Sequence, residues 1–172
     1  GLMITGYAGT GKTWPLKHIR PILAELLPGK QLVMALRHAA AMIAGGKTIQ
    51  HYLCKYRSKP IAPGTIVIID EFSEVQLHTW AELARWKLAG AIFILVGDAD
   101  GQRRPMFDRW QDAMNQRDIR QSQFLWELCG GVRVQMTTNR RGDDPVLFKR
   151  YCDLYPYADD ESYKATAIQW LR

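Results

Sequence analysis

The sequence predicts an α/β fold, with a parallel sheet of about five strands flanked by helices. Short runs of apolar, β-type residues alternate along the chain with longer segments of helical periodicity, and each run is bounded by Gly, Pro or Asp. This alternation is typical of βα units, whose helices cover both faces of a parallel sheet. A length of 172 residues suits one domain, so we expect residues 1–172 to form a single unit.

The predicted elements follow one another in a regular order. We expect strands at residues 2–5, 31–35, 65–69, 91–96 and 132–136. We expect helices at residues 12–27, 38–44, 73–87, 106–115 and 144–154. The apolar stripe of the first helix consists of Leu16, Ile19, Leu23 and Leu26. Pro15 and Pro21 each delete an interior hydrogen bond, so this helix should kink or break near Ile19. Trp80 and Trp86 of the third helix are predicted to pack in the core.

The composition excludes several classes of protein. No apolar run approaches the roughly 20 residues of a membrane span, so the chain is not expected to be integral to a membrane. Cys54, Cys129 and Cys152 are odd in number and far apart, which indicates reduced thiols in an intracellular protein, cytoplasmic or nuclear. The formal charge of +6 favours a polyanionic partner such as nucleic acid, although a solvated basic surface explains the same excess.

The segment GYAGTGKT, residues 6–13, has the spacing of a phosphate-binding loop. Gly6, Gly11, Lys12 and Thr13 satisfy G-x-x-x-x-G-K-[ST] between an apolar strand and an amphipathic helix. Glycines let successive backbone N–H groups wrap around phosphate, Lys12 would reach the β and γ phosphates, and the Thr13 hydroxyl would ligate Mg²⁺. The residues predicted to bind nucleotide are Gly6, Ala8, Gly9, Thr10, Gly11, Lys12 and Thr13.

The segment IVIIDEF, residues 66–72, supplies the acidic side chains that such a loop lacks. Its apolar run describes a strand buried on both faces, so Asp70 and Glu71 emerge at the carboxyl end, where ligands bind in open α/β sheets. Asp70 is predicted to hold Mg²⁺ together with Thr13, and Glu71 to deprotonate an attacking water. The alternative is an acidic cap for the helix that begins near Ser73.

A third apolar strand ends in a polar loop at FILVGDADGQ, residues 93–102. This places Asp98 and Gln102 beside the same phosphates if the strand neighbours the first one. A Gln there can bond both the γ phosphate and the attacking water. Residues 98–101 also match the D-x-x-G of a GTPase switch, but no N-K-x-D guanine reader follows.

With these elements in this order, the chain resembles the first RecA-like lobe of superfamily 1 DNA helicases, and among them the RecD-like branch. GYAGTGKT is similar to the family's motif I, IIDEF to motif II, and GDADGQRRP to motif III. The resemblance implies a RecA-like P-loop NTPase that uses ATP and Mg²⁺. TTNRRGDDPVLF, residues 137–148, looks like the family's Asn-x-Arg element, which implies that Arg141 faces the γ phosphate.

The resemblance also implies contacts with single-stranded nucleic acid, with DNA favoured. VMALRHAAAMIAGGKTIQHYL, residues 33–53, is similar to the family's motif Ia region. The nucleic-acid-binding residues that it implies are Arg37, His38, Thr48, Gln50 and His51. The alternative for RHAAAM is a helix whose small residues pack closely on the sheet.

Two departures from the family pattern bear on these expectations. Motif III carries one extra residue, because Gly101 intervenes before Gln102, and Gln50 stands where the family usually has His. The chain also opens on Gly1 with no initiator Met, so we expect a fragment of a longer protein. The family's second RecA-like lobe, with its arginine finger, is missing from this chain. Because such a finger contributes ~10³ to 10⁵ in rate, the chain by itself should bind nucleotide and turn over slowly.

Two other classes of function remain open at this point. One is a P-loop phosphotransferase or GTPase that acts on a small acceptor. The other is a non-enzymatic binding module, whose binding is switched by nucleotide without hydrolysis. The 58 positions between Lys12 and Asp70 leave room for the motif Ia unit, which favours the helicase interpretation.

Overall fold

The computed structural model describes residues 1–27, 30–99, 121–142 and 144–154. Within them, six strands form one parallel sheet in the order β3-β2-β4-β5-β1-β6. The strands are β1 (Leu2–Gly6), β2 (Gln31–Ala35), β3 (Lys47–Thr48), β4 (Ile66–Asp70), β5 (Ile92–Gly97) and β6 (Arg133–Met136). The five predicted strands are confirmed to within one residue at each end. The two residues of β3 were missed, because a strand so short and polar has no apolar pattern.

The described helices are α1 (Thr13–Leu26), α2 (His38–Ile43), α3 (Ile49–Lys55), the 3-10 helix η1 (Phe72–Glu74), α4 (Leu77–Leu88), α6 (Gln123–Leu128) and α7 (Pro145–Leu154). The predicted helix at residues 73–87 is in fact two elements, because extended Val75 and Gln76 separate η1 from α4. Neither α3 nor α6 was predicted. The helix predicted at residues 106–115 lies outside the described residues.

Of the kink or break predicted near Ile19 in the first helix, the break does not occur. Helix α1 is continuous across Pro21. Pro15 is the third residue of the helix, where the backbone N–H has no intrahelical partner in any case, so only Pro21 removes an interior bond. The predicted apolar stripe is also shorter than expected, because Leu26 is exposed.

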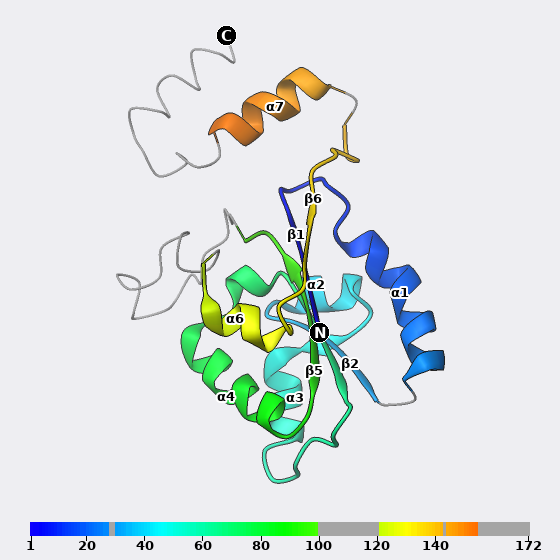
Figure 1. Ribbon diagram of the computed structural model, residues 1–172, viewed down its shortest axis with the longest axis vertical. Helices are drawn as coiled ribbons and strands as arrows, with labels where there is room; N and C mark the ends of the chain where they lie inside the picture. Colours follow the sequence, from blue (N-terminus) through cyan, green and yellow to red (C-terminus); the bar gives the residue numbers. More distant parts are fainter. Residues whose placement is uncertain (28–29, 100–120, 143, 155–172) are drawn as a thin grey trace.

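Helices cover both faces of the sheet, and each face has its own core. In Figure 1, α1 lies on one side of the strands and α4 and α6 lie on the other. Alternate residues of β4 point to opposite faces, so Ile66 and Ile68 pack with Leu16 of α1, whereas Val67 and Ile69 belong to the other cluster. Trp80 and Trp86 are buried in that second cluster, as predicted. Among the described residues, no helix is both long and apolar enough to cross a membrane.

The strand order decides which loops meet. β1 pairs with β5 and β6, and β4 pairs with β2 and β5. All of these pairs are parallel, so the loops that follow β1, β4, β5 and β6 leave from the same edge of the sheet. The glycine-rich loop follows β1, and the acidic pair ends β4. The sheet therefore brings together four segments that are far apart in the sequence.

Candidate nucleotide-binding site

The loop between β1 and α1 has a backbone that needs glycine at defined places. Gly9 has φ of 88°, and a Cβ there would lie 3.0 Å from Oδ1 of Asn139. A Cβ on Gly6 would lie 2.4 Å from the carbonyl oxygen of Met136, the last residue of β6. Side chains at these positions would thus collide with the strand and loop that close the site from the other side.

The polar side chains of the loop are arranged around its own carbonyl groups. Nζ of Lys12 donates to the carbonyls of Gly6 at 2.9 Å and Tyr7 at 3.0 Å, and the Thr10 hydroxyl also donates to Tyr7 at 2.8 Å. Thr10 is buried, so its hydroxyl is used inside the loop. Lys12 is half-buried and lines the cavity over the loop.

Asp70 faces the start of α1. Its Oδ2 lies 3.5 Å from the hydroxyl of Thr13, which donates to it. Burial of the carboxyl, followed by the neighbouring charge of Glu71, raises the pKa of Asp70 to about 6. A hydroxyl and one carboxylate suit Mg²⁺, which is usually bound through one or two carboxylates plus substrate phosphates. Thr13 and Asp70 therefore fit a magnesium ion held between them.

Glu71 adopts a conformation that is uncommon for a residue with a side chain. Its φ of 52° and ψ of 45° make it the one non-glycine residue of the described chain in the left-handed region. Its backbone N–H donates to Oδ1 of Asp70 at 3.0 Å. This geometry turns the chain sharply at the end of β4, and Glu71 lines the cavity over the glycine-rich loop.

That cavity has a volume of about 390 Å³. Its lining residues come from the glycine-rich loop, the start of α1, the end of α2 and the segments that follow β4, β5 and β6. They are Ala8, Gly9, Gly11, Lys12, Thr13, Trp14, Ile43, Glu71, Ser73, Asp98 and Arg141. Asp98 lines the cavity because β5 pairs with β1, as the sequence prediction for Asp98 required. Gly6 and Thr10 support the loop without lining the cavity. Gln102, predicted beside the same phosphates, lies outside the described residues.

Arg141 is brought to the cavity by the segment that follows β6. The backbone N–H of Arg140 donates to the carbonyl of Gly9 at 2.8 Å, and that of Arg141 donates to Oδ1 of Asn139 at 3.0 Å. Farther along, the Tyr151 ring of α7 lies edge-on to Tyr7, with ring centroids 6.3 Å apart. The segment after β6 is therefore anchored directly on the glycine-rich loop.

Sequence reasoning missed one polar group in this cavity. Ser73 was treated only as the start of a helix, but its residue is buried, and its hydroxyl has no hydrogen-bond partner among the described residues. Its spacing from Asp70 carried the signal, since η1 is one tight turn that returns Ser73 to the cavity. Trp14 is the exposed second residue of α1, and its ring lies against that of His18 with centroids 3.9 Å apart and the planes tilted by 34°.

The residues predicted to contact nucleic acid do not line this cavity. Nε of Arg37 donates to Oε2 of Glu74 at 2.7 Å, in a close ion pair. Thr48 caps α3 by accepting the backbone N–H of His51 at 3.2 Å. Nε2 of Gln50 is 3.5 Å from Sγ of Cys54, and His38 is the exposed first residue of α2. The predicted contacts thus gather on the segment from α2 to α3 and remain a prediction.

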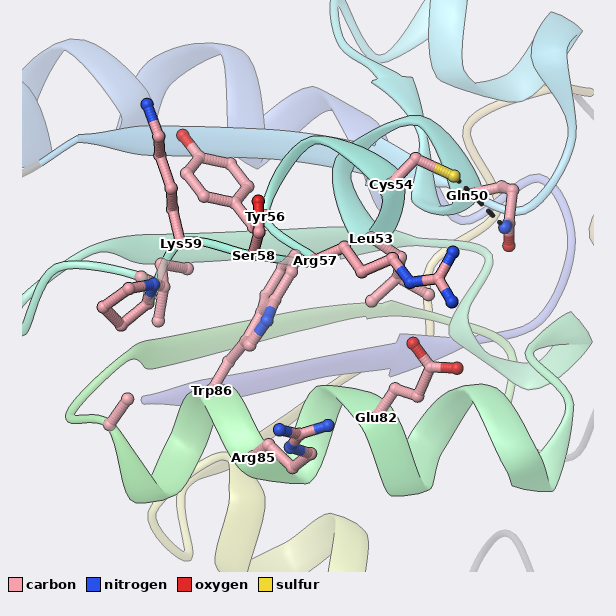
Figure 2. Close-up of a pocket in the computed structure, with 13 residues that line it drawn as sticks. Gln50, Leu53, Cys54, Tyr56, Arg57, Ser58, Lys59, Glu82, Arg85 and Trp86 are labelled. Atoms are coloured by element: carbon pink, nitrogen blue, oxygen red, sulfur yellow. Dashed lines mark hydrogen bonds between the residues drawn. The ribbon is translucent and has the colours of Figure 1, made fainter.

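A second cavity, of about 450 Å³, lies between α3 and α4 and shares no lining residue with the first. Figure 2 shows the Trp86 ring in its centre, with Arg57 above it and Arg85 below. Gln50 lies at one end, where its dashed contact with Cys54 is drawn.

The fold and the first cavity together define a class of protein. A parallel sheet with a glycine-rich loop after β1 and an acidic pair at the end of the β4 strand is a RecA-like α/β fold of the P-loop type. The chain belongs to the AAA domain family, whose model matches residues 2–106. No curated protein sequence matches the chain.

Several solved structures of Pif1 helicases are similar to this chain in fold. The chain is similar to Bacteroides Pif1 bound to ssDNA, with 20% identity, a TM-score of 0.64, and coverage of 91% of this chain and 43% of that one. Bacteroides Pif1 in complex with ADP-AlF3 and ssDNA has 23% identity and a TM-score of 0.64, and the match covers 91% and 42%. Pif1 helicase from Candida albicans has 20% identity and a TM-score of 0.59, over 90% and 39%. The chain spans less than half the length of these structures.

Proposed function

We propose that this chain is the ATP-binding and ATP-hydrolysing lobe of a helicase or translocase that acts on single-stranded DNA. The observation that carries the proposal is the meeting of Thr13 and Asp70 at 3.5 Å, with Glu71 in the same cavity. A phosphate loop alone would serve many classes of nucleotide-binding protein. The likeness in fold to Pif1 helicases, two of them bound to ssDNA, favours the motor over other P-loop classes.

The proposal assigns roles to residues of the cavity and to Gln102, which lies outside the described residues. Backbone N–H groups of the loop and the ammonium of Lys12 bind the phosphates, and Thr13 and Asp70 hold Mg²⁺, whose charge offsets that of the triphosphate. Glu71 accepts a proton from the attacking water. Arg141 faces the γ phosphate, and Gln102 orients the water.

The nucleic acid is proposed to pass over the segment from α2 to α3. The residues proposed to contact it are those from the resemblance, Arg37, His38, Thr48, Gln50 and His51. Because the chain covers less than half of each similar structure, we propose that it forms one domain of a longer protein. A second RecA-like lobe is then the partner that completes the ATP site and the nucleic-acid track. Opening and closing between two lobes is the usual way in which such motors move along a strand.

Within superfamily 1, two branches fit this chain. We propose a RecD-like assignment from the motif pattern, and the similar structures make a Pif1-like assignment equally well supported. The first alternative function is a P-loop phosphotransferase or GTPase with a small acceptor, for which the D-x-x-G at residues 98–101 is the supporting pattern. The second is a nucleotide-gated binding module without turnover.

One experiment separates these functions. ATP and GTP hydrolysis by the full-length protein is measured with and without single-stranded DNA, and strand separation is measured on a duplex with a single-stranded tail. The motor predicts ATP hydrolysis that DNA stimulates and ATP-dependent strand separation. Transfer of phosphate to a small acceptor, or a marked preference for GTP, would instead support the phosphotransferase or GTPase. Tight ATP binding with no hydrolysis under any of these conditions would support the binding module.

A further inference from the structure

An ion pair joins two segments that leave the sheet side by side. β2 and β4 are neighbours, and Ala35 at the end of β2 is in register with Asp70 at the end of β4. Arg37 follows β2, and Glu74 is the last residue of η1, which follows β4. Their side chains therefore meet beside the catalytic end of β4, although they are 37 positions apart in the sequence.

The contact is bidentate and largely removed from solvent on the acidic side. Nε and Nη2 of Arg37 donate to the two carboxylate oxygens of Glu74. The Glu74 side chain is 4% exposed, whereas that of Arg37 is 48% exposed. The loss of hydration of a carboxylate buried to this degree is offset by hydrogen bonds and an opposite charge. The planar guanidinium supplies both, because its two N–H groups match the two carboxylate oxygens. The pair thus fixes the position of Glu74, and of η1 with it, relative to β2.

The position of Glu74 bears directly on Glu71. The backbone N–H of Glu74 donates to the carbonyl of Glu71 at 3.0 Å, so the two residues close one turn. Glu71 is left-handed, and such a conformation persists only where its surroundings hold it on both sides. Asp70 holds the N–H of Glu71, and η1 holds its carbonyl. The pKa of Arg37 is raised by its hydrogen bond to Glu74 and by the charges of Glu74 and Glu71, so its guanidinium also lies within the electrostatic reach of Glu71.

We propose that Arg37 is a positioning residue for hydrolysis, which acts through its paired hydrogen bonds to Glu74 to hold the turn that presents Glu71 to the nucleotide. This inference rests on the proposed function, because it assumes that Glu71 acts on the attacking water. The positioning role requires Arg37 for hydrolysis even when no nucleic acid is present. A residue that only contacts the nucleic acid would not be required under that condition.

The test compares steady-state hydrolysis without nucleic acid in variants of the full-length protein. Arg37→Ala should lower kcat about 10- to 100-fold, as for a displaced catalytic group, and leave KM and the Kd for an ATP analogue within about twofold. Arg37→Lys, which keeps the charge but loses the fork, should fall between wild type and Arg37→Ala. Lys149→Ala is the control, since it removes the exposed ion pair of Lys149 with Asp153 on α7 and should change neither parameter.

A double variant separates positioning from simple stabilisation. Arg37→Ala removes two hydrogen bonds and an opposite charge from the buried Glu74 carboxylate, so it should also lower the unfolding temperature. Arg37→Met/Glu74→Met removes both charges, which should restore the unfolding temperature because an apolar pair packs without unmet charge. The hydrogen bonds between Arg37 and Glu74 are still missing in this variant, so kcat should stay low. A kcat equal to wild type in Arg37→Ala, or a kcat fully restored in the double variant, would overturn the inference.

Glu71→Gln, assayed in the same series, keeps the two hypotheses apart. Hydrolysis that falls in Glu71→Gln but not in Arg37→Ala overturns the positioning role and leaves the proposed function standing. Hydrolysis that is absent from wild type overturns the proposed function and the positioning role with it. Hydrolysis that is unaffected by Glu71→Gln removes Glu71 from catalysis, and the positioning role with it, and leaves the ATPase function standing.

Discussion

The hydroxyl of Thr13 lies 3.5 Å from Oδ2 of Asp70, although 57 positions separate the two residues in the sequence. Thr13 begins the helix after β1, and Asp70 ends β4. β1 and β4 are not neighbours, because β5 lies between them. The contact therefore spans the gap across one strand, and this gap is the place that a metal and the phosphates would occupy.

Lys12→Ala should weaken ATP binding by roughly 100-fold or more, since charge-assisted hydrogen bonds contribute about 1.5–3 kcal/mol each and the ammonium makes more than one. Isothermal titration with ATP and Mg²⁺ measures this directly. Lys17→Ala is the matched control, because Lys17 is exposed on the same helix and does not line the cavity. Undiminished affinity in Lys12→Ala would rule out the phosphate cradle.

Glu71→Gln should keep ATP affinity and lose ~10² to 10⁴ in the rate of hydrolysis, because glutamine cannot accept the proton of the attacking water. Single-turnover hydrolysis in the full-length protein separates the chemical step from product release. A rate equal to that of wild type would remove Glu71 from this role.

Asp70→Asn should stabilise the nucleotide-free protein while it abolishes binding that depends on Mg²⁺. The pKa of Asp70 is raised from 3.8 to about 6, so the folded protein binds a proton there more tightly than the unfolded chain does. The free energy of unfolding of wild type therefore falls, on account of this group, as the pH rises from about 4 to about 6, and stays lowered above it. The Asp70→Asn variant carries no charge at this position, so at pH 8 its free energy of unfolding should exceed that of wild type by roughly 1–3 kcal/mol.

Urea unfolding of wild type and Asp70→Asn across this pH range measures the effect. Because both side chains are neutral in acid, the two proteins should become equally stable near pH 3, which serves as the internal control. A difference in stability that is independent of pH would show that the raised pKa is not its cause.

Gly97→Ala should destabilise the fold by roughly 1–3 kcal/mol, as for an overpacked core. A Cβ on Gly97 would lie 2.9 Å from both the backbone nitrogen and Cδ1 of Phe72, so η1 would have to shift. Because Phe72 directly follows Glu71, hydrolysis should fall along with stability. The control is Gly142→Ala, whose Cβ would meet its nearest neighbour at 3.6 Å, and thermal unfolding compares the two. Equal unfolding temperatures would contradict the close contact.

Ser73→Ala should leave the nucleotide-free protein as stable as wild type or more stable by about 1 kcal/mol, because the buried hydroxyl has no partner among the described residues. We expect the same change to weaken binding of ATP with Mg²⁺, since Ser73 lines the cavity together with Lys12 and Thr13. Parallel thermal unfolding and ATP titration test both parts. A loss of stability without nucleotide would mean that the hydroxyl has a structural partner.

Local patterns in the sequence determined much of this protein. The apolar runs placed five strands to within one residue. For β1, β2, β4 and β5 the reason is that a strand buried on both faces has to be apolar throughout, whereas β6 is partly exposed. The spacing G-x-x-x-x-G-K-[ST] and the pair Asp70 and Glu71 identified the phosphate loop and the acidic end of β4, because their chemistry is local to each motif. Helices α3 and α6 were missed, because six or seven residues give little periodicity and neither segment has the run of alanines that marked the equally short α2 as a helix.

Only the tertiary structure decided how these segments meet. No local pattern indicated that Arg37 would pair with Glu74, because Arg37 by itself looks like an exposed base and Glu74 like a surface acid. The pairing of β2 with β4 brings their loops together, and burial of Glu74 then requires a cation. The left-handed turn at Glu71 and the place of Ser73 on the cavity wall likewise depend on the packing of η1 against β5. Sequence determines which groups a segment offers, whereas strand order determines which of them share one buried site.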